Sequence, residues 1–266
     1  MSGTTLEVAG PAGRLHAYRS GTASAGLPVV LVHGINMDGH VWDALAARLG
    51  PDRETVVLDL RGHGASVKAG PFDAAAYADD VVAVMDAAGV ERAHLVGTSF
   101  GGPVAATIAA RAPERVASVT AIGSAVSVAG AVDIEGGIAA MREIGAPDFF
   151  RGFMGQASFA PGTDPALLEQ AVAVATAPDR DVDLIAEVVR AAFSADASDA
   201  VAAVKAPALV ITGEHDQTCP VAAGEVLAAA LGTELRVVTG RGHMVVVEDP
   251  DAVAGLLRPH LAANDG

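Results

Sequence analysis

The 266-residue chain has little cysteine, few aromatic side chains and few positive charges. Because Cys219 is the single cysteine, the chain forms no disulfide within itself. Seventeen Lys and Arg stand against thirty-two Asp and Glu, and the formal net charge is −15. A charge of this sign repels phosphate backbones and anionic lipids. We therefore expect no nucleic acid and no membrane surface among its partners.

Long apolar runs are also missing, although 51% of the residues are hydrophobic. No run approaches the roughly 20 residues that span a bilayer. The N-terminal stretch MSGTTLEVAG has neither a basic region nor an apolar signal core. A cytoplasmic location is therefore the expectation. The length of 266 residues is typical of one α/β domain. Because aromatic residues make up only 4% of the chain, we expect a compact core of small side chains, mostly Ala, Val and Leu.

Short β-branched runs alternate with helical patterns along most of the chain. Four runs are typical of strands buried on both faces, namely VVLVHG (29–34), TVVLDL (55–60), AHLVG (93–97) and VASVTAIG (116–123). Between them, HVWDALAARLG and AAYADDVVAVMDAAG place apolar residues at helical spacing and end at Gly50 and Gly89. LEVAG and RLHAYRSG form an expected antiparallel pair at the start. This order predicts an α/β fold, with a mostly parallel central sheet and helices on both faces.

From residue 124 to residue 205 the pattern becomes mostly helical, and we interpret this segment as a cap inserted into a core of residues 1–123 and 206–266. The cap holds five of the seven phenylalanines and two methionines: Phe149, Phe150, Phe153, Phe159, Phe193, Met141 and Met154. An apolar roof favours uncharged substrates, and we expect Phe149, Phe153 and Met154 to contact them. An apolar cap surface is also compatible with a homodimer.

A serine lies where one predicted strand gives way to a helix, in GTSFGG (97–102). Glycines on both sides of Ser99 suit a sharp turn that exposes its hydroxyl. The helix that follows would direct its free N–H groups and its positive end at the same place. A serine hydroxyl is a weak nucleophile at neutral pH, so it needs a base, and that base needs an orienting acid.

Candidates for the base and the acid follow the last two predicted strands. Asp216 lies in EHDQTCP after the run ALVITG, and His243 lies in RGHMVVVEDP after ELRVVTG. The three residues thus follow three different strands, in the chain order Ser, Asp, His. Glu214 is a rival to Asp216 as the acid. His215 shares a loop with Asp216 and is poorly placed to receive a proton from Ser99.

The elbow GTSFG and this chain order resemble the α/β-hydrolase superfamily, whose G-x-S-x-G pattern the elbow matches. The resemblance extends from residue 5 to about residue 261 and is least specific in the cap. It implies an α/β-hydrolase fold, with Ser99 as the nucleophile, His243 as the general base and Asp216 as the acid that orients the base.

HGIN (33–36) resembles the oxyanion segment of the same family. The resemblance implies that Ile35 and Phe100 donate their backbone N–H groups to the oxyanion. Asn36 is a candidate substrate contact. DLRGHGAS (59–66) is also characteristic of the family, and we interpret it as scaffold, together with the histidine of HGIN.

These features predict a serine hydrolase that cleaves a small, largely apolar carboxylic ester or lactone through an acyl-enzyme. Three other functions stay open: a C–C bond hydrolase, a cofactor-free haloperoxidase or dioxygenase, and a ligand-binding member without catalysis. Haloalkane dehalogenases and epoxide hydrolases use an aspartate nucleophile where this chain has Ser99. Because no metal-ligand spacing occurs, we expect no metal, no cofactor and a small-molecule substrate as the partner. The acyl group and the leaving group stay unidentified.

Overall fold

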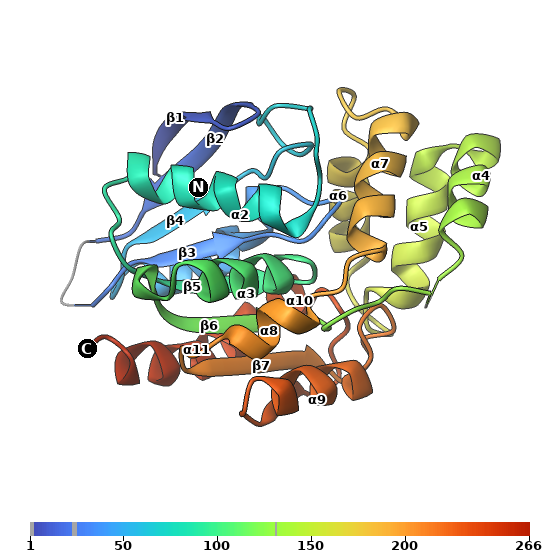
Figure 1. Ribbon diagram of the computed structural model, residues 1–266. Coiled ribbons are helices and arrows are strands. Elements are labelled where there is room, and N and C mark those ends of the chain that lie inside the picture. Colours follow the sequence, from blue (N-terminus) through green and yellow to red (C-terminus); the bar gives the residue numbers. More distant parts are fainter. Residues whose placement is uncertain (1–2, 23–25, 131) are drawn as a thin grey trace.

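The computed structural model describes residues 3–22, 26–130 and 132–266. The first two residues of the expected core and residue 131 of the expected cap lie outside them. An eight-stranded sheet runs through the molecule in the order β1-β2-β4-β3-β5-β6-β7-β8 (Figure 1). The strands are β1 (Thr4–Gly10), β2 (Gly13–Ser20), β3 (Val29–Val32), β4 (Thr55–Leu58), β5 (Ala93–Thr98), β6 (Val116–Ile122), β7 (Ala208–Gly213) and β8 (Leu235–Val238). β2 pairs antiparallel with β1 and β4, and the other neighbours are parallel.

The central strands are buried on both faces, as their β-branched runs predict. Every residue of β3, β4, β5 and β6 is buried. β3 and β4 end earlier than the runs suggest, at Val32 and Leu58. They end there because the next residues, His33 and Asp59, leave the sheet and hold the following loops by side-chain hydrogen bonds to the backbone.

Helices cover both faces of the sheet. α2 (Ala74–Ala87), α3 (Gly101–Arg111) and α9 (Val221–Ala230) lie on one face, and α1 (Asp43–Leu49), α10 (Val245–Glu248) and α11 (Pro250–Ala263) lie on the other (Figure 1). Short 3-10 turns precede α1 (η1, Gly39–Trp42) and β6 (η2, Pro113–Arg115). Gly89 ends the α2 segment with a φ of +69°. No helix in the described segments is both long and apolar enough to cross a bilayer.

Five helices lie between β6 and β7: α4 (Ile134–Ile144), α5 (Ala146–Ala157), α6 (Pro165–Ala175), α7 (Val182–Phe193) and α8 (Ser198–Ala203). The first four stand beyond the carboxyl ends of the strands, whereas α8 returns to the sheet and packs against α3 (Figure 1). A separate apolar cluster holds the first four together, and Met244 of the core joins it. The boundaries of the cap at residues 124 and 205 stay a prediction.

Candidate active site

Ser99 occupies a strained turn between β5 and α3. Its φ is +52°, in the left-handed region that residues other than glycine rarely adopt. The flanking glycines are required by close backbone approach. A Cβ on Gly97 would lie 2.1 Å from the carbonyl oxygen of Gly101, and a Cβ on Gly101 would lie 2.2 Å from that of Val32. Such a turn stores about 1–3 kcal/mol of strain and sets the hydroxyl at the carboxyl edge of the sheet.

Asp216 and His243 come together from the loops after β7 and β8. His243 Nδ1–H donates to Asp216 Oδ2 at 2.9 Å. The other carboxylate oxygen, Oδ1, accepts the backbone N–H groups of Thr218 and Cys219 at 2.9 and 2.7 Å. Both side chains are buried, with 1% of Asp216 and 5% of His243 exposed. The carboxylate is therefore held by its own loop, and Nε2 is the ring nitrogen left to take part in proton transfer.

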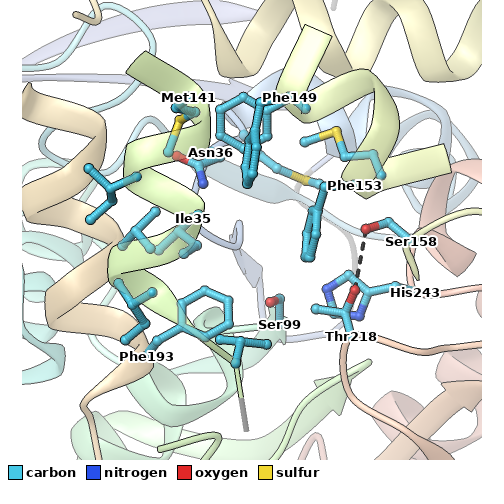
Figure 2. Close-up of a pocket in the computed structure, with 18 of the residues that line it drawn as sticks. Ile35, Asn36, Ser99, Met141, Phe149, Phe153, Ser158, Phe193, Thr218 and His243 are labelled. Atoms are coloured by element: carbon cyan, nitrogen blue, oxygen red, sulfur yellow. Dashed lines mark hydrogen bonds between the residues drawn. The ribbon is translucent and has the colours of Figure 1, made fainter. Parts of the chain in front are cut away.

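Ser99 and His243 line the same cavity (Figure 2). No hydrogen bond joins the serine hydroxyl to the imidazole within the part of the chain that the structure describes. Proton transfer needs the heavy atoms about 2.6–3.2 Å apart, a distance that catalytic pairs often reach only with substrate bound. Glu214 lies away from this pair, because its Oε2 accepts the N–H of Gly240 at 2.8 Å. The carboxylate that contacts the imidazole is that of Asp216.

Two backbone N–H groups beside Ser99 have no acceptor among the described residues: those of Ile35 and Phe100. Phe100 begins the turn into α3, so the positive end of the helix dipole points the same way. The loop with Ile35 passes close to the serine, because a Cβ on Gly34 would lie 2.7 Å from Ser99 Cβ. This arrangement can receive an anion next to the serine hydroxyl.

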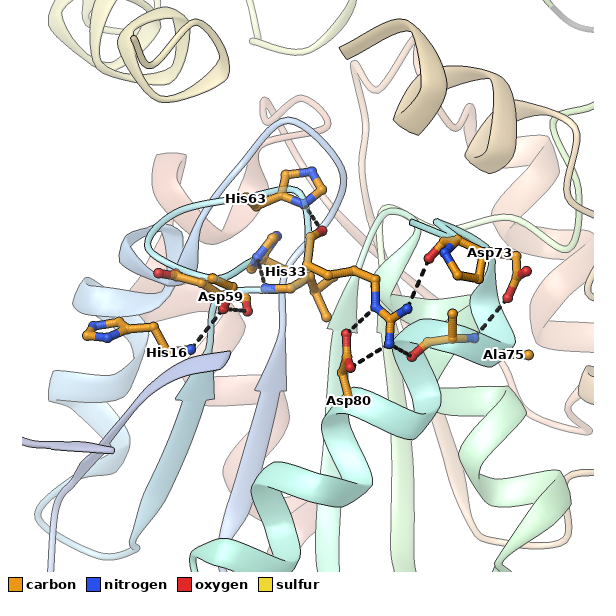
Figure 3. Close-up of polar contacts among 12 residues, drawn as sticks. His16, His33, Asp59, His63, Asp73, Ala75 and Asp80 are labelled. Atoms are coloured by element: carbon orange, nitrogen blue, oxygen red, sulfur yellow. Dashed lines mark hydrogen bonds and ion pairs between the residues drawn. The ribbon is translucent and has the colours of Figure 1, made fainter. Parts of the chain in front are cut away.

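Two buried histidines hold that loop (Figure 3). His33 Nδ1–H donates to the carbonyl of Gly34 at 2.6 Å, and its Nε2 accepts the N–H of Leu60 at 3.0 Å. His63 Nε2 accepts the N–H of Asn36 at 3.0 Å. Burial lowers the pKa of both imidazoles, and each uses a lone pair as an acceptor, so both are neutral. Their contacts are those of scaffold, in agreement with the sequence interpretation.

The cavity has a volume of about 360 Å³ and an apolar lining. The phenylalanine and methionine side chains of the cap that line it are Met141, Phe149, Phe150, Phe153, Met154 and Phe193. The rings of Phe149 and Phe153 are stacked, with centroids 6.2 Å apart. Phe159 is buried within the cap cluster instead. No Lys or Arg occurs among the described residues of the lining. Most of the lining is therefore apolar.

Residues 28–161 match the family described as alpha/beta hydrolase fold. The chain belongs to the α/β-hydrolase family. This result confirms the fold class that the elbow and the chain order predict.

Three relatives match different shares of this chain and of their own length. A pimeloyl-[acyl-carrier protein] methyl ester esterase of Neisseria meningitidis is 30% identical and covers 86% of this chain and 91% of its own. A 2-hydroxymuconate semialdehyde hydrolase of Pseudomonas sp. is 30% identical and covers 91% of this chain and 89% of its own. A dihydrolipoyllysine-residue acetyltransferase component of an acetoin cleaving system from Pseudomonas putida is 40% identical over 116 residues, but the match spans only 31% of its length.

Among solved structures, the enol-lactonase of Burkholderia xenovorans LB400 is similar to this hydrolase. The two share 26% identity and a TM-score of 0.84, over 94% of this chain and 96% of the lactonase. The similarity therefore includes the segment that holds the cap helices as well as the sheet.

Asn36 of the hydrolase lines the cavity and also binds a cap residue that the sequence did not indicate. Its φ is +60°, and its Oδ1 accepts a hydrogen bond from Arg180 Nη2 at 2.9 Å. Arg180 also donates to the carbonyls of Gly62 and Ala175, at 3.0 and 2.8 Å. Burial lowers the pKa of Arg180 to about 10, so it stays protonated at neutral pH. No carboxylate of the described residues forms a salt bridge with it. Arg180 lies in the loop between α6 and α7, and nothing in the sequence of that loop indicates that its side chain is buried.

Side chains of residues 59–66 hold neighbouring elements together by polar contacts (Figure 3). Arg61 makes a buried bidentate ion pair with Asp80, at 2.6 and 2.7 Å. Asp59 Oδ1 accepts the hydroxyl of Tyr18 at 3.1 Å and the N–H of Gly39 at 2.8 Å. These contacts join β2, β4, η1 and α2 beneath the loop of Ile35. The segment is scaffold in this hydrolase.

Cys219 and the remaining histidines supply no second site in the described part of the chain. Burial raises the pKa of the Cys219 thiol, which keeps it in the unreactive protonated form. Its backbone N–H holds Asp216, so its role is structural. No group of His, Cys, Asp and Glu in the described segments is arranged to hold a metal ion.

Proposed function

We propose that this hydrolase cleaves a small, largely apolar carboxylic ester or lactone through an acyl-enzyme. One observation carries the proposal. His243, which is hydrogen-bonded to Asp216, lines the same apolar cavity as Ser99, whose strained backbone sets its hydroxyl at the cavity wall. Nucleophile, base and orienting acid are the three parts that acyl transfer needs.

The proposed reaction begins when Ser99 Oγ attacks the carbonyl carbon and His243 Nε2 takes the serine proton. Asp216 stabilises the imidazolium that forms, because its carboxylate already accepts Nδ1–H. The N–H groups of Ile35 and Phe100 bind the oxyanion, each contributing about 3 kcal/mol. His243 then passes the proton to the leaving oxygen, and water hydrolyses the acyl-enzyme by the same route in reverse.

The cavity lining supports an uncharged substrate. A charged group buried against Phe and Met side chains would lose its hydration without gaining a partner. Asp133 lines the cavity, but its Oδ1 caps α4 by accepting the N–H of Gly136 at 2.9 Å. The names of two similar proteins, a methyl ester esterase and an enol-lactonase, also refer to cleavage of an acyl C–O bond.

Cleavage of a C–C bond is a second candidate, because the 2-hydroxymuconate semialdehyde hydrolase is 30% identical over most of both chains. The substrate in that name is an acid. The described lining of this cavity offers no Lys or Arg to bind a carboxylate, and this difference favours the ester. Parallel assays with a vinylogous diketone acid and with a neutral ester of similar size distinguish C–C bond cleavage from ester cleavage.

Covalent labelling tests the nucleophile. A fluorophosphonate should add one equivalent to the parent protein by intact mass and none to Ser99→Ala. Ser158→Ala is the matched control, because Ser158 also lines the cavity but makes its hydrogen bond to Thr218. Turnover of p-nitrophenyl acetate should follow the same pattern. Equal labelling or equal turnover by Ser99→Ala would exclude the mechanism.

A further inference from the structure

A second, much smaller cavity adjoins Ser99. Its volume is about 40 Å³, against about 360 Å³ for the cavity beneath the cap. Its wall includes Phe100, Pro103 and residues 125–128, at the start of α3 and just after β6. Four residues line both cavities: Ile35, Ser99, Phe193 and Thr218. The serine hydroxyl therefore stands at the junction of a large and a small space.

His243 distinguishes the two spaces, because it lines the large cavity and is absent from the described lining of the small one. The tetrahedral carbon on Ser99 carries an oxyanion, a leaving oxygen and the acyl substituent. The leaving oxygen must lie within hydrogen-bond reach of His243 to receive its proton. The leaving group therefore extends into the large cavity, and the acyl substituent points to the small one.

We propose that the hydrolase is specific for esters that join a short acyl group to a bulky apolar alcohol, an inference that rests on the proposed function. One water needs a space of about 10–15 Å³, so the small cavity of about 40 Å³ holds roughly three atoms of that size, which suits an acyl group of two or three carbons. The larger cavity accommodates an aromatic or branched alcohol. In the reaction, the Ser99 Oγ–acyl bond forms, the acyl–alkoxy bond breaks, and His243 protonates the departing alkoxide. Water then releases a short carboxylic acid.

Phe193 is the specificity-determining side chain in this scheme. It is the last residue of α7 and lines the large cavity (Figure 2), and it also lines the small one. Ile35 is the other apolar residue common to both walls, but its backbone N–H is the proposed oxyanion donor, so a change of its side chain would alter the oxyanion loop as well as the cavity wall. Removing the phenyl ring of Phe193 would join the two spaces. The acyl side would then accept larger groups.

Two isomeric esters test the proposal: benzyl acetate and methyl phenylacetate have the same atoms with the ester bond reversed. After division by the rate constant of alkaline hydrolysis, kcat/KM of the parent protein should be at least about 10-fold higher for benzyl acetate, since a poorly accommodated group costs roughly this factor or more. In the series benzyl formate, acetate, butyrate and octanoate, kcat/KM should fall sharply beyond a three-carbon acyl group. Equal rates, or faster cleavage of methyl phenylacetate, would overturn the assignment while leaving the serine mechanism intact.

Variants test which wall sets the preference. Phe193→Ala should raise kcat/KM for methyl phenylacetate and for benzyl butyrate, and bring the isomer ratio towards one. Phe149→Ala is the matched control, because Phe149 lines only the large cavity, so the preference for short acyl groups should persist. Phe193→Leu serves the same purpose if the alanine variant fails to fold. Hydrolysis of neither isomer by the parent protein would contradict the proposed function itself, and the preference with it.

Discussion

Arg180 Nη2 donates a hydrogen bond to Asn36 Oδ1 across 2.9 Å, and this contact joins the segment between α6 and α7 to the loop of Ile35. Arg180 is only 5% exposed and is bound by neutral acceptors. Asn36 needs such support, because its φ of +60° is strained. The backbone N–H that precedes it, on Ile35, is therefore positioned partly by the cap.

Arg180→Met should lower kcat for p-nitrophenyl acetate by about 10-fold or more with little change in KM, because a misplaced oxyanion donor weakens transition-state binding. Arg180→Lys should recover only part of the loss, since an ammonium cannot reproduce the fixed fork of three hydrogen bonds. Asp179→Asn is the control. It weakens the 2.9 Å ion pair with Lys68, which tethers the same segment at the surface, and leaves the hydrogen bonds of Lys68 to residues 63–66 in place. A similar fall in kcat for Asp179→Asn would mean that any loosening of the segment suffices.

Ser99→Gly should be more stable than Ser99→Ala by about 1 kcal/mol, although both lose the hydroxyl and both should be inactive. Alanine keeps a Cβ at a φ of +52°, whereas glycine adopts that φ without strain. Urea denaturation of the two variants measures the difference. Equal stability would mean that the elbow is not strained by its Cβ.

Asp216→Asn should lower kcat by about 10³–10⁴-fold, a loss of the size found when a triad acid is neutralised elsewhere. Oδ1 accepts two backbone N–H groups, so the amide oxygen of asparagine would take that place and its NH₂ would face His243. The imidazole would then carry its proton on Nε2 and could not act as the base. Glu214→Gln, in the same loop, should retain activity. If the two variants lose activity equally, the acid is wrongly assigned.

Stability should fall as the pH drops below about 6.5, the ordinary pKa of histidine. The folded protein keeps His33 and His63 neutral, with pKa values lowered by burial, while the unfolded chain binds a proton at each. Between the lowered pKa and 6.5 the unfolded state therefore holds more protons, and the free energy of unfolding decreases with falling pH.

His63→Gln isolates this effect, because an amide oxygen can accept the N–H of Asn36 but cannot be protonated in this range. The variant should be less stable than the parent protein at pH 7.5, and its unfolding free energy should change less between pH 7.5 and pH 5.5. Urea denaturation at the two pH values gives both quantities. An unchanged pH dependence would show that the folded protein protonates His63 as readily as the unfolded chain.

Local pattern was enough to predict the strands, the elbow and the chain order of Ser99, Asp216 and His243. The buried runs follow from β-branched residues, and Gly97 follows from a contact within the turn itself, whereas Gly101 is required by the neighbouring strand β3. Gly97 and Gly101 have no room for a Cβ whatever the cap does, because backbone fills that space. Such features can be recognised from the sequence alone.

Contacts between distant segments were decided only by the tertiary structure. The sequence places Glu214 and Asp216 in one loop, but only Asp216 meets the imidazole that follows β8. Likewise, Arg180 lies 144 residues from Asn36 in the chain, and nothing local indicates that they touch. The same holds for the size of each space beside Ser99, because a cavity is the volume that side chains from several elements leave unfilled. Those volumes depend on packing, which no single segment encodes.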